Sequence, residues 1–132
     1  GTFKLFMLDV GLMCAMNKLS SDAILLGNDI FSTYRGAMTE QYVCQQLIGE
    51  VDSIYYWSAD NARGEIDFLI QKGDKIIPIE VKAEENLKAK SLSAFVARYP
   101  SLHAIRLSMS DYREQDWMTN VPLYAACRIT DR

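Results

Sequence analysis

The chain has 132 residues, of which 49% are hydrophobic and 23% are charged, and its formal net charge is −3. This length fits one domain that needs neither disulfides nor a structural metal to fold. The composition excludes disordered and collagen-like proteins, no apolar run approaches the ~20 residues of a membrane span, and the acidic balance disfavours tight non-specific nucleic-acid binding.

We expect one compact unit over residues 1–132, with a lead-in region at 1–35, a core at 36–109 and a C-terminal strand region at 110–132. Its expected elements, in chain order, are an extended or strand-like stretch at 3–8, a short helix at 11–16, a capped turn near 20–22, a helix at 34–48, strands at 53–58, 65–71 and 75–83, a helix at 87–99, a strand at 102–109, a polar loop at 111–120 and a last strand at 121–129. This order predicts an α/β domain whose mixed central sheet is flanked by helices.

Cysteine and histidine chemistry has little support in the sequence. Cys14, Cys44 and Cys127 are far apart and form no C-x-x-C motif, so neither a zinc ribbon nor a thioredoxin-like site is expected. Free thiols fit a reducing, cytoplasmic location. Because His103 is the single histidine and no nucleophile elbow is present, any catalysis is expected to use carboxylates and lysines.

The strands expected at 65–71 and 75–83 form a hairpin whose register follows from the sequence. A two-residue turn at 73–74 sets Asp67 opposite Glu80 and Glu65 opposite Lys82. A three-residue loop would mix apolar and charged faces, so we expect the two-residue turn. Three apolar residues of the first strand are then expected on one shared face: Ile66, Phe68 and Ile70.

Two opposed carboxylates at Asp67 and Glu80 predict a cation between them. Directly opposed strand residues have Cβ atoms ~5 Å apart, where like charges repel. Mg²⁺ fits such a pair, since it takes carboxylate oxygens and keeps water and phosphate oxygens in its shell. Lys82 could neutralise the site or stabilise charge on a phosphate under attack. The ordinary alternative is a solvated sheet face with a salt bridge.

Glu40 is a charged residue at a position where an apolar one is expected, because it follows the helical spacing of a stripe that should face the sheet. Gly36, Val43 and Leu47 continue that stripe, and Ala37, Cys44 and Ile48 lie beside it. A buried carboxylate without a partner is costly, so Glu40 should meet a metal, Lys82 or a hydrogen-bond donor. Alternatively, it lies at the edge of the stripe and reaches water.

Asp67, the run Glu80-Val81-Lys82 and Glu40 on the preceding helix resemble the PD-(D/E)XK nuclease superfamily, with its restriction-endonuclease-like fold and α-β-β-β-α-β core order. More narrowly, the chain resembles the C-terminal domain of unknown function of predicted AAA-superfamily ATPases. The segments that carry this closer match are FMLDVGL at 6–12, GAMTE at 36–40, YWS at 56–58, EIDF at 65–68 and IPIEVK at 77–82.

The resemblance implies residue roles. It makes Asp67, Glu80 and the Val81 carbonyl ligands of Mg²⁺ or Mn²⁺, with Glu40 as a further ligand, and Lys82 the catalytic lysine. The sequence departs from the superfamily pattern before Asp67, where Ile66 stands in place of proline.

The resemblance also implies an ATPase module before Gly1, and the first residues have neither a start Met nor a signal peptide. ATP would belong to that module, because no G-x-x-x-x-G-K-[ST] phosphate loop occurs in this chain. Two functions are therefore expected as alternatives. One is metal-dependent hydrolysis of DNA phosphodiesters, favoured by the acid and lysine set. The other is a non-catalytic binding or assembly module that serves the ATPase, favoured by the acidic pI of about 5.1.

Overall fold

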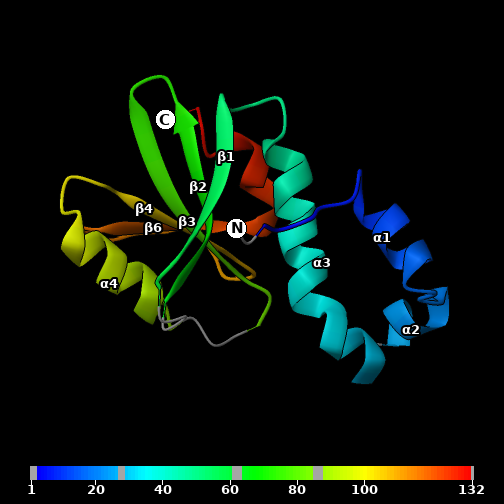
Figure 1. Ribbon diagram of the computed structural model, residues 1–132. Coiled ribbons are helices and arrows are strands. Elements are labelled where there is room, and N and C mark those ends of the chain that lie inside the picture. The colour runs from blue at the N-terminus through cyan, green and yellow to red at the C-terminus, as the bar shows by residue number, and fades with distance from the viewer. Residues whose placement is uncertain (1–2, 27–28, 61–63, 85–87, 132) are drawn as a thin grey trace.

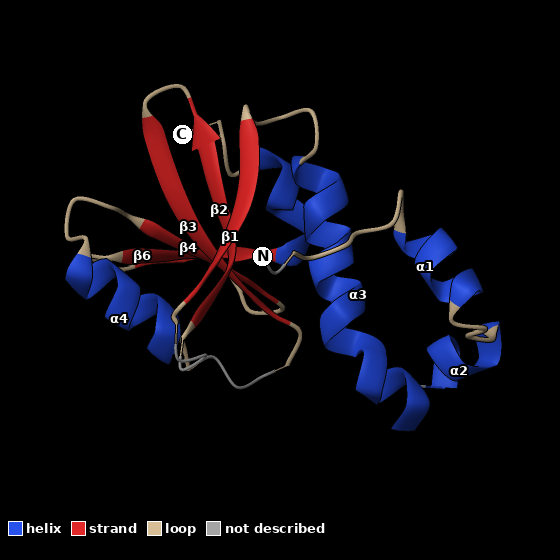
Figure 2. Cartoon of the chain, in the orientation of Figure 1, coloured by secondary structure: helices blue, strands red, loops and turns tan. Residues whose placement is uncertain are grey.

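The computed structural model describes residues 3–26, 29–60, 64–84 and 88–131. Figures 1 and 2 show a strongly twisted sheet with one long helix on one side and a shorter helix on the other. Two further short helices lie beyond the long helix, away from the sheet (Figure 1). None of the described helices is long and apolar enough to cross a membrane.

The sheet is mixed and has the strand order β1-β2-β3-β4-β6-β5. Its strands are β1 (Ser53–Ser58), β2 (Glu65–Lys72), β3 (Lys75–Lys82), β4 (Ala104–Ser108), β5 (Arg113–Glu114) and β6 (Met118–Pro122). Strands β1, β2 and β3 are antiparallel neighbours, β3, β4 and β6 run parallel, and β5 is antiparallel to β6. The prediction of an α/β domain with a mixed sheet flanked by helices is confirmed.

The helices are α1 (Val10–Met16), α2 (Ser21–Leu26), α3 (Asp29–Leu47), α4 (Lys90–Arg98) and the 3-10 helix η1 (Leu123–Arg128). Asp9 caps α1, because its carboxylate accepts a hydrogen bond from the Leu12 N–H at 2.8 Å. The predicted cap near residue 20 is confirmed, since Ser20 Oγ accepts from the Ala23 N–H. Helix α3 begins at Asp29, five residues before the predicted start.

Two apolar cores lie on opposite faces of the sheet. On the α3 side, Val43 and Leu47 of α3 pack on Phe68, Ile70 and other sheet residues. On the α4 side, the core is made by Ile66, Leu92, Phe95, Val96, Ala104 and Met118. The stripe on α3 is narrower than predicted, because Gly36, Ala37 and Ile48 are exposed.

The predicted hairpin register is confirmed between Lys72–Lys75 and Phe68–Ile79. Gly73 has φ +60°, a left-handed backbone conformation that glycine adopts without strain in a two-residue turn. The ladder ends at Phe68 and Ile79, so the predicted pairs Asp67–Glu80 and Glu65–Lys82 are not part of it.

The prediction that Ile66, Phe68 and Ile70 share one face is wrong for Ile66. Tyr55 pairs with Leu69, whereas Trp57 pairs with Ile66, so β2 has one extra residue at this point. Such a bulge breaks the alternation of side chains. Ile66 therefore packs on the α4 side, while Phe68 and Ile70 stay on the α3 side.

The prediction for the C-terminal region is also wrong. The expected loop at 111–120 contains β5 and most of β6, and the expected strand at 121–129 is largely the 3-10 helix η1. Thr119 and Asn120 are polar yet buried, because other side chains and carbonyl groups satisfy them. Polar residues with such partners are hard to recognise as a strand from sequence alone.

Candidate active site

The bulge in β2 sets the position of Asp67. One residue beyond the β2–β3 ladder, Asp67 Oδ2 accepts a hydrogen bond from the Val81 N–H at 2.8 Å. The N–H and C=O of a paired strand residue point to the same neighbour, so the Val81 carbonyl also faces β2. The Asp67 side chain is 16% exposed. The acid is thus anchored between the strands, against the backbone of the Glu80-Val81-Lys82 run.

Glu80 supplies a second carboxylate from β3. Its Oε1 lies 2.6 Å from Lys82 Nζ, and its side chain is nearly buried. Its Oε2 is buried and has no hydrogen-bond partner among the residues that the structure describes. Arg106 of β4 stands opposite Glu80 in the parallel pairing and attracts it. One oxygen of this carboxylate is therefore paired, and the other is left without a donor.

A lysine that the sequence analysis did not single out lies among the carboxylates. Lys4 Nζ is 2.7 Å from Glu65 Oε1, 3.3 Å from Glu40 Oε2 and 3.8 Å from Asp67 Oδ1. These three acids and Glu80 are called the acid cluster below. The prediction that Glu65 faces Lys82 is not met by the ion pairs of the described residues, where Glu65 contacts Lys4 and Lys82 contacts Glu80.

Residues 3–9, called the N-terminal strap, carry Lys4 past α3 (Figure 1). The side chain of Gln41 holds the strap at Met7, where its Oε1 accepts from the backbone N–H at 2.7 Å and its Nε2 donates to the carbonyl at 2.9 Å. The Phe6 ring packs against Phe68, with centroids 5.7 Å apart. The lead-in is extended, as one of the two predictions for residues 3–8 had it.

The electrostatics of the acid cluster favour added positive charge. Burial raises the pKa of Asp67, Glu80 and Glu40, and repulsion between neighbouring carboxylates raises each further. The Val81 N–H and Lys4 oppose this rise at Asp67, and Lys82 opposes it at Glu80. Burial alone would lower the pKa of Lys4, but the surrounding carboxylates raise it.

The structure brings the predicted residues Asp67, Glu80, Lys82 and Glu40 into one region. Asp67 lies near both of the other acids, because its charge raises the pKa of Glu40 and the pKa of Glu80. Glu40 meets a hydrogen-bond donor, as expected for an inward carboxylate, but that donor is Lys4. A lysine 36 residues from its partner leaves no periodic signal, so sequence reasoning missed it.

The donor set has the chemistry of a two-carboxylate cation site. Among the described residues, no three His, Cys, Asp or Glu side chains are arranged so that they could hold a metal ion by themselves. Mg²⁺, however, commonly binds through one or two carboxylates and completes its shell with water and phosphate oxygens. Asp67 and Glu80 fit that requirement, since a buried Glu80 oxygen lacks a partner.

Residues 35–126 match a family described as a domain of unknown function, DUF4143. The chain belongs to the DUF4143 family. No curated protein and no solved structure matches it. The matched region contains Glu40, Asp67, Glu80 and Lys82, whereas Lys4 lies outside it.

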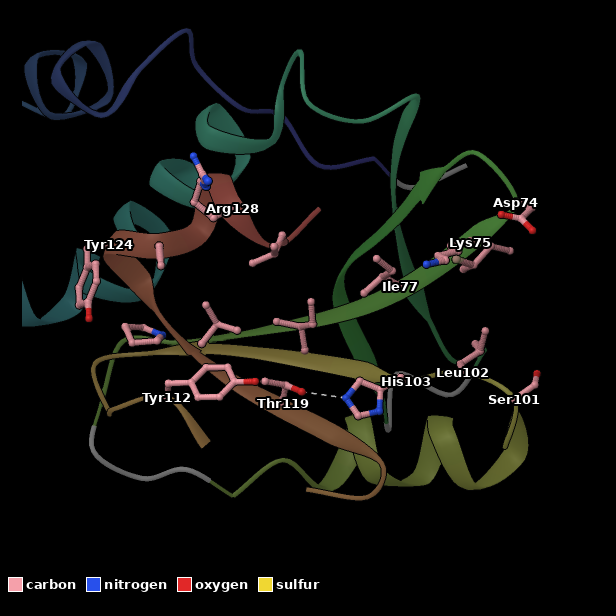
Figure 3. Close-up of a pocket in the computed structure, with 16 residues that line it drawn as sticks. Asp74, Lys75, Ile77, Ser101, Leu102, His103, Tyr112, Thr119, Tyr124 and Arg128 are labelled. Carbon is pink, nitrogen blue, oxygen red and sulfur yellow. Dashed lines mark hydrogen bonds between the residues drawn. The ribbon is translucent and has the colours of Figure 1, made fainter. Parts of the chain in front are cut away.

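Hollows in the described part of the surface include one beside η1 and one beside α4. A cavity of about 820 Å³ lies beside η1, with an apolar floor that includes Ile77 and a hydrogen bond between His103 and Thr119 at its edge (Figure 3). No member of the acid cluster lines it. A shallow hollow of about 500 Å³ lies beside α4 and is lined by Lys88, Lys90 and Arg106. No member of the acid cluster lines this second hollow either, but Arg106 in its lining is the register partner of Glu80.

Proposed function

We propose that this DUF4143 domain is a PD-(D/E)XK-type nuclease domain that hydrolyses DNA phosphodiester bonds with Mg²⁺ or Mn²⁺ and serves an AAA-type ATPase. The observation that carries the proposal is the convergence of Asp67, Glu80 and Lys82 at the β2 bulge. The α-β-β-β-α-β order from α3 to β4 agrees with it. A bulge that re-aims an acidic side chain is a frequent feature beside active sites.

Each residue of this group has a chemical role in the proposal. Asp67 and Glu80 would hold the cation, together with the Val81 carbonyl, and Glu40 would add negative charge nearby. The bound cation would neutralise the phosphate and supply an activated water. The Lys82 ammonium, 2.6 Å from Glu80, would orient that water and stabilise charge on the attacked phosphate.

The cationic hollow beside α4 supports a polyanionic substrate despite the net charge of −3. Lys88, Lys90 and Arg106 line it, and Arg106 neighbours Glu80 in the sheet. The field at a site depends on its local charges more than on the total charge. Glu80 does not line this hollow, but its register partner Arg106 does, so a phosphodiester chain held there would lie one strand away from Glu80.

The test compares DNA cleavage by the wild-type chain and by Asp67→Asn with Mg²⁺ or Mn²⁺ present. We expect the substitution to reduce cleavage by at least about 100-fold, because it removes one of two carboxylate ligands. Asp74→Asn is a matched control, since Asp74 is exposed at the hairpin turn, outside the acid cluster. Equal cleavage by wild type and Asp67→Asn would contradict the proposed site.

The second candidate is a non-catalytic module that keeps the fold and offers a binding or assembly surface to the ATPase. The position of Lys4 favours it, because an ammonium group already lies within ion-pair distance of three carboxylates. This candidate predicts no DNA cleavage and no Mn²⁺ uptake by calorimetry in the wild type or in any variant of Lys4.

A further inference from the structure

We infer that the N-terminal strap is an autoinhibitory element, in which Lys4 and a divalent cation compete for the carboxylates around Asp67. This inference rests on the proposed metal site and adds a means of regulating it. It depends on three observations: the place of the Lys4 ammonium, the engagement of both Asp67 oxygens, and the way the strap is fixed.

The Lys4 ammonium faces the Asp67 oxygen that accepts no hydrogen bond from β3. Asp67 Oδ2 faces the Val81 N–H at 2.8 Å, and Oδ1 faces Lys4 Nζ at 3.8 Å. A divalent cation bound at Oδ1 would lie beside this ammonium, and two positive charges a few ångströms apart repel. Glu65 and Glu40 hold the ammonium there, at 2.7 Å and 3.3 Å.

The strap that delivers Lys4 has no helix or strand of its own and is held on α3 and β2 by side-chain contacts. Gln41 accepts a hydrogen bond from the Met7 N–H and donates one to the Met7 carbonyl, which fixes the strap on α3. Directly after the strap, the Val10 N–H at the start of α1 donates to Gln45. The Phe6 ring packs on Phe68 of the core, whereas Phe3, Leu5 and Leu8 of the strap are exposed and add little to it. The strap also lies outside the region matched by the family.

Binding linkage makes the competition reciprocal. If docking of Lys4 lowers the affinity for the cation, binding of the cation must lower the equilibrium constant for docking of Lys4 by the same factor. Metal binding should therefore loosen the strap, and removal of the Lys4 charge should tighten metal binding. Release of the strap would remove one positive charge from the acid cluster and open Asp67 to a divalent cation.

The experiment measures Mn²⁺ binding by calorimetry for the wild type, Lys4→Met and Lys72→Met. Lys72→Met is the matched control, because it removes the same charge from the exposed end of β2. We expect Lys4→Met to bind Mn²⁺ about tenfold more tightly than the wild type, and Lys72→Met to match the wild type. Addition of Mg²⁺ to the wild type should speed amide hydrogen exchange at Met7.

The outcomes separate the two proposals. Equal Mn²⁺ affinity in all three chains would overturn the autoinhibitory strap and leave the metal site standing. No Mn²⁺ binding by any chain would overturn both. Mn²⁺ binding by Lys4→Met, with none by the wild type or Lys72→Met, would support the proposal and show that Lys4 excludes the cation completely. A thermal unfolding scan with and without Mg²⁺ checks folding, and the stabilisation by Mg²⁺ should be larger in Lys4→Met than in the wild type.

Discussion

Two buried polar regions of this sheet are built on different principles. In the first, called the polar network, Asn120 Oδ1 accepts from Arg106 Nε and Ser108 Oγ, both at 2.8 Å. The Asn120 amide donates to the carbonyls of Ser110 and Asp111. In the second, the acid cluster, carboxylates outnumber the nearby cations and one Glu80 oxygen lacks a partner among the described residues.

This difference between the two regions indicates which of them serves the stability of the fold and which is better explained by function. Fully satisfied buried networks fix the packing of a fold, whereas a buried group without a partner costs free energy. The polar network orders β4 and β6, so its residues are best explained by the fold. The acid cluster is poorly explained by stability alone, which is why we assign it a cation.

The largest effect expected from this comparison is on Asn120. Asn120→Leu should lower the free energy of unfolding by about 4 kcal/mol, because it removes four hydrogen bonds of the polar network, two accepted from Arg106 and Ser108 and two donated to carbonyl groups. Urea denaturation monitored by tryptophan fluorescence measures this loss. Glu80→Gln is the contrasting variant and should change the free energy of unfolding by less than about 1 kcal/mol.

If Glu80→Gln lost as much free energy of unfolding as Asn120→Leu, the two regions would not differ as proposed. Such a result would assign Glu80 to the support of the fold. It would also mean that the ion pair with Lys82 stabilises the sheet more than the burial of the carboxylate destabilises it.

A smaller effect is expected in the pH dependence of stability. Burial and mutual repulsion raise the pKa values of Asp67, Glu40 and Glu80 above their ordinary values of 3.8, 4.5 and 4.5. The folded state then binds protons more tightly than the unfolded state. Stability from this source is present below the ordinary values and is lost as pH rises through the raised ones, by at most about 1.4 kcal/mol per pH unit for each proton.

The measurement is the free energy of unfolding of the wild type and Asp67→Asn between pH 4 and pH 7. Asp67→Asn should lose less stability than the wild type as pH rises, because it removes the carboxylate whose charge Glu40 and Glu80 both experience. Parallel curves for the two chains would show that the acid cluster carries no electrostatic strain.

The sequence predicted the structure best in the β2–β3 hairpin, where the turn and the alternation of apolar residues allow a single register. The turn at Gly73 and the alternation in β3 predicted the register from Phe68 to Lys72, together with the proximity of Asp67 and Glu80. The prediction failed where contacts between segments far apart in the sequence determine which way a side chain points. The bulge that turns Ile66 to the α4 side depends on pairing with β1, and Lys4 reaches the acids on a strap that Gln41 and Phe68 hold in place.

The C-terminal region shows a second limit. β6 contains Thr119 and Asn120, and its buried position depends on hydrogen bonds to His103, Arg106 and Ser108. Those partners are supplied by other segments of the chain, so the strand has no apolar alternation to reveal it. Predictions from local pattern therefore placed the last strand too late.

The most direct test of the central claim is a crystal structure of the protein soaked in Mn²⁺, with the ion located by anomalous scattering. We predict a peak in contact with Asp67 and Glu80, accompanied by withdrawal of the Lys4 ammonium from Asp67. The absence of a peak at the acid cluster under saturating Mn²⁺, with Lys4 still between Glu40 and Glu65, would contradict the assignment of a cation to this site.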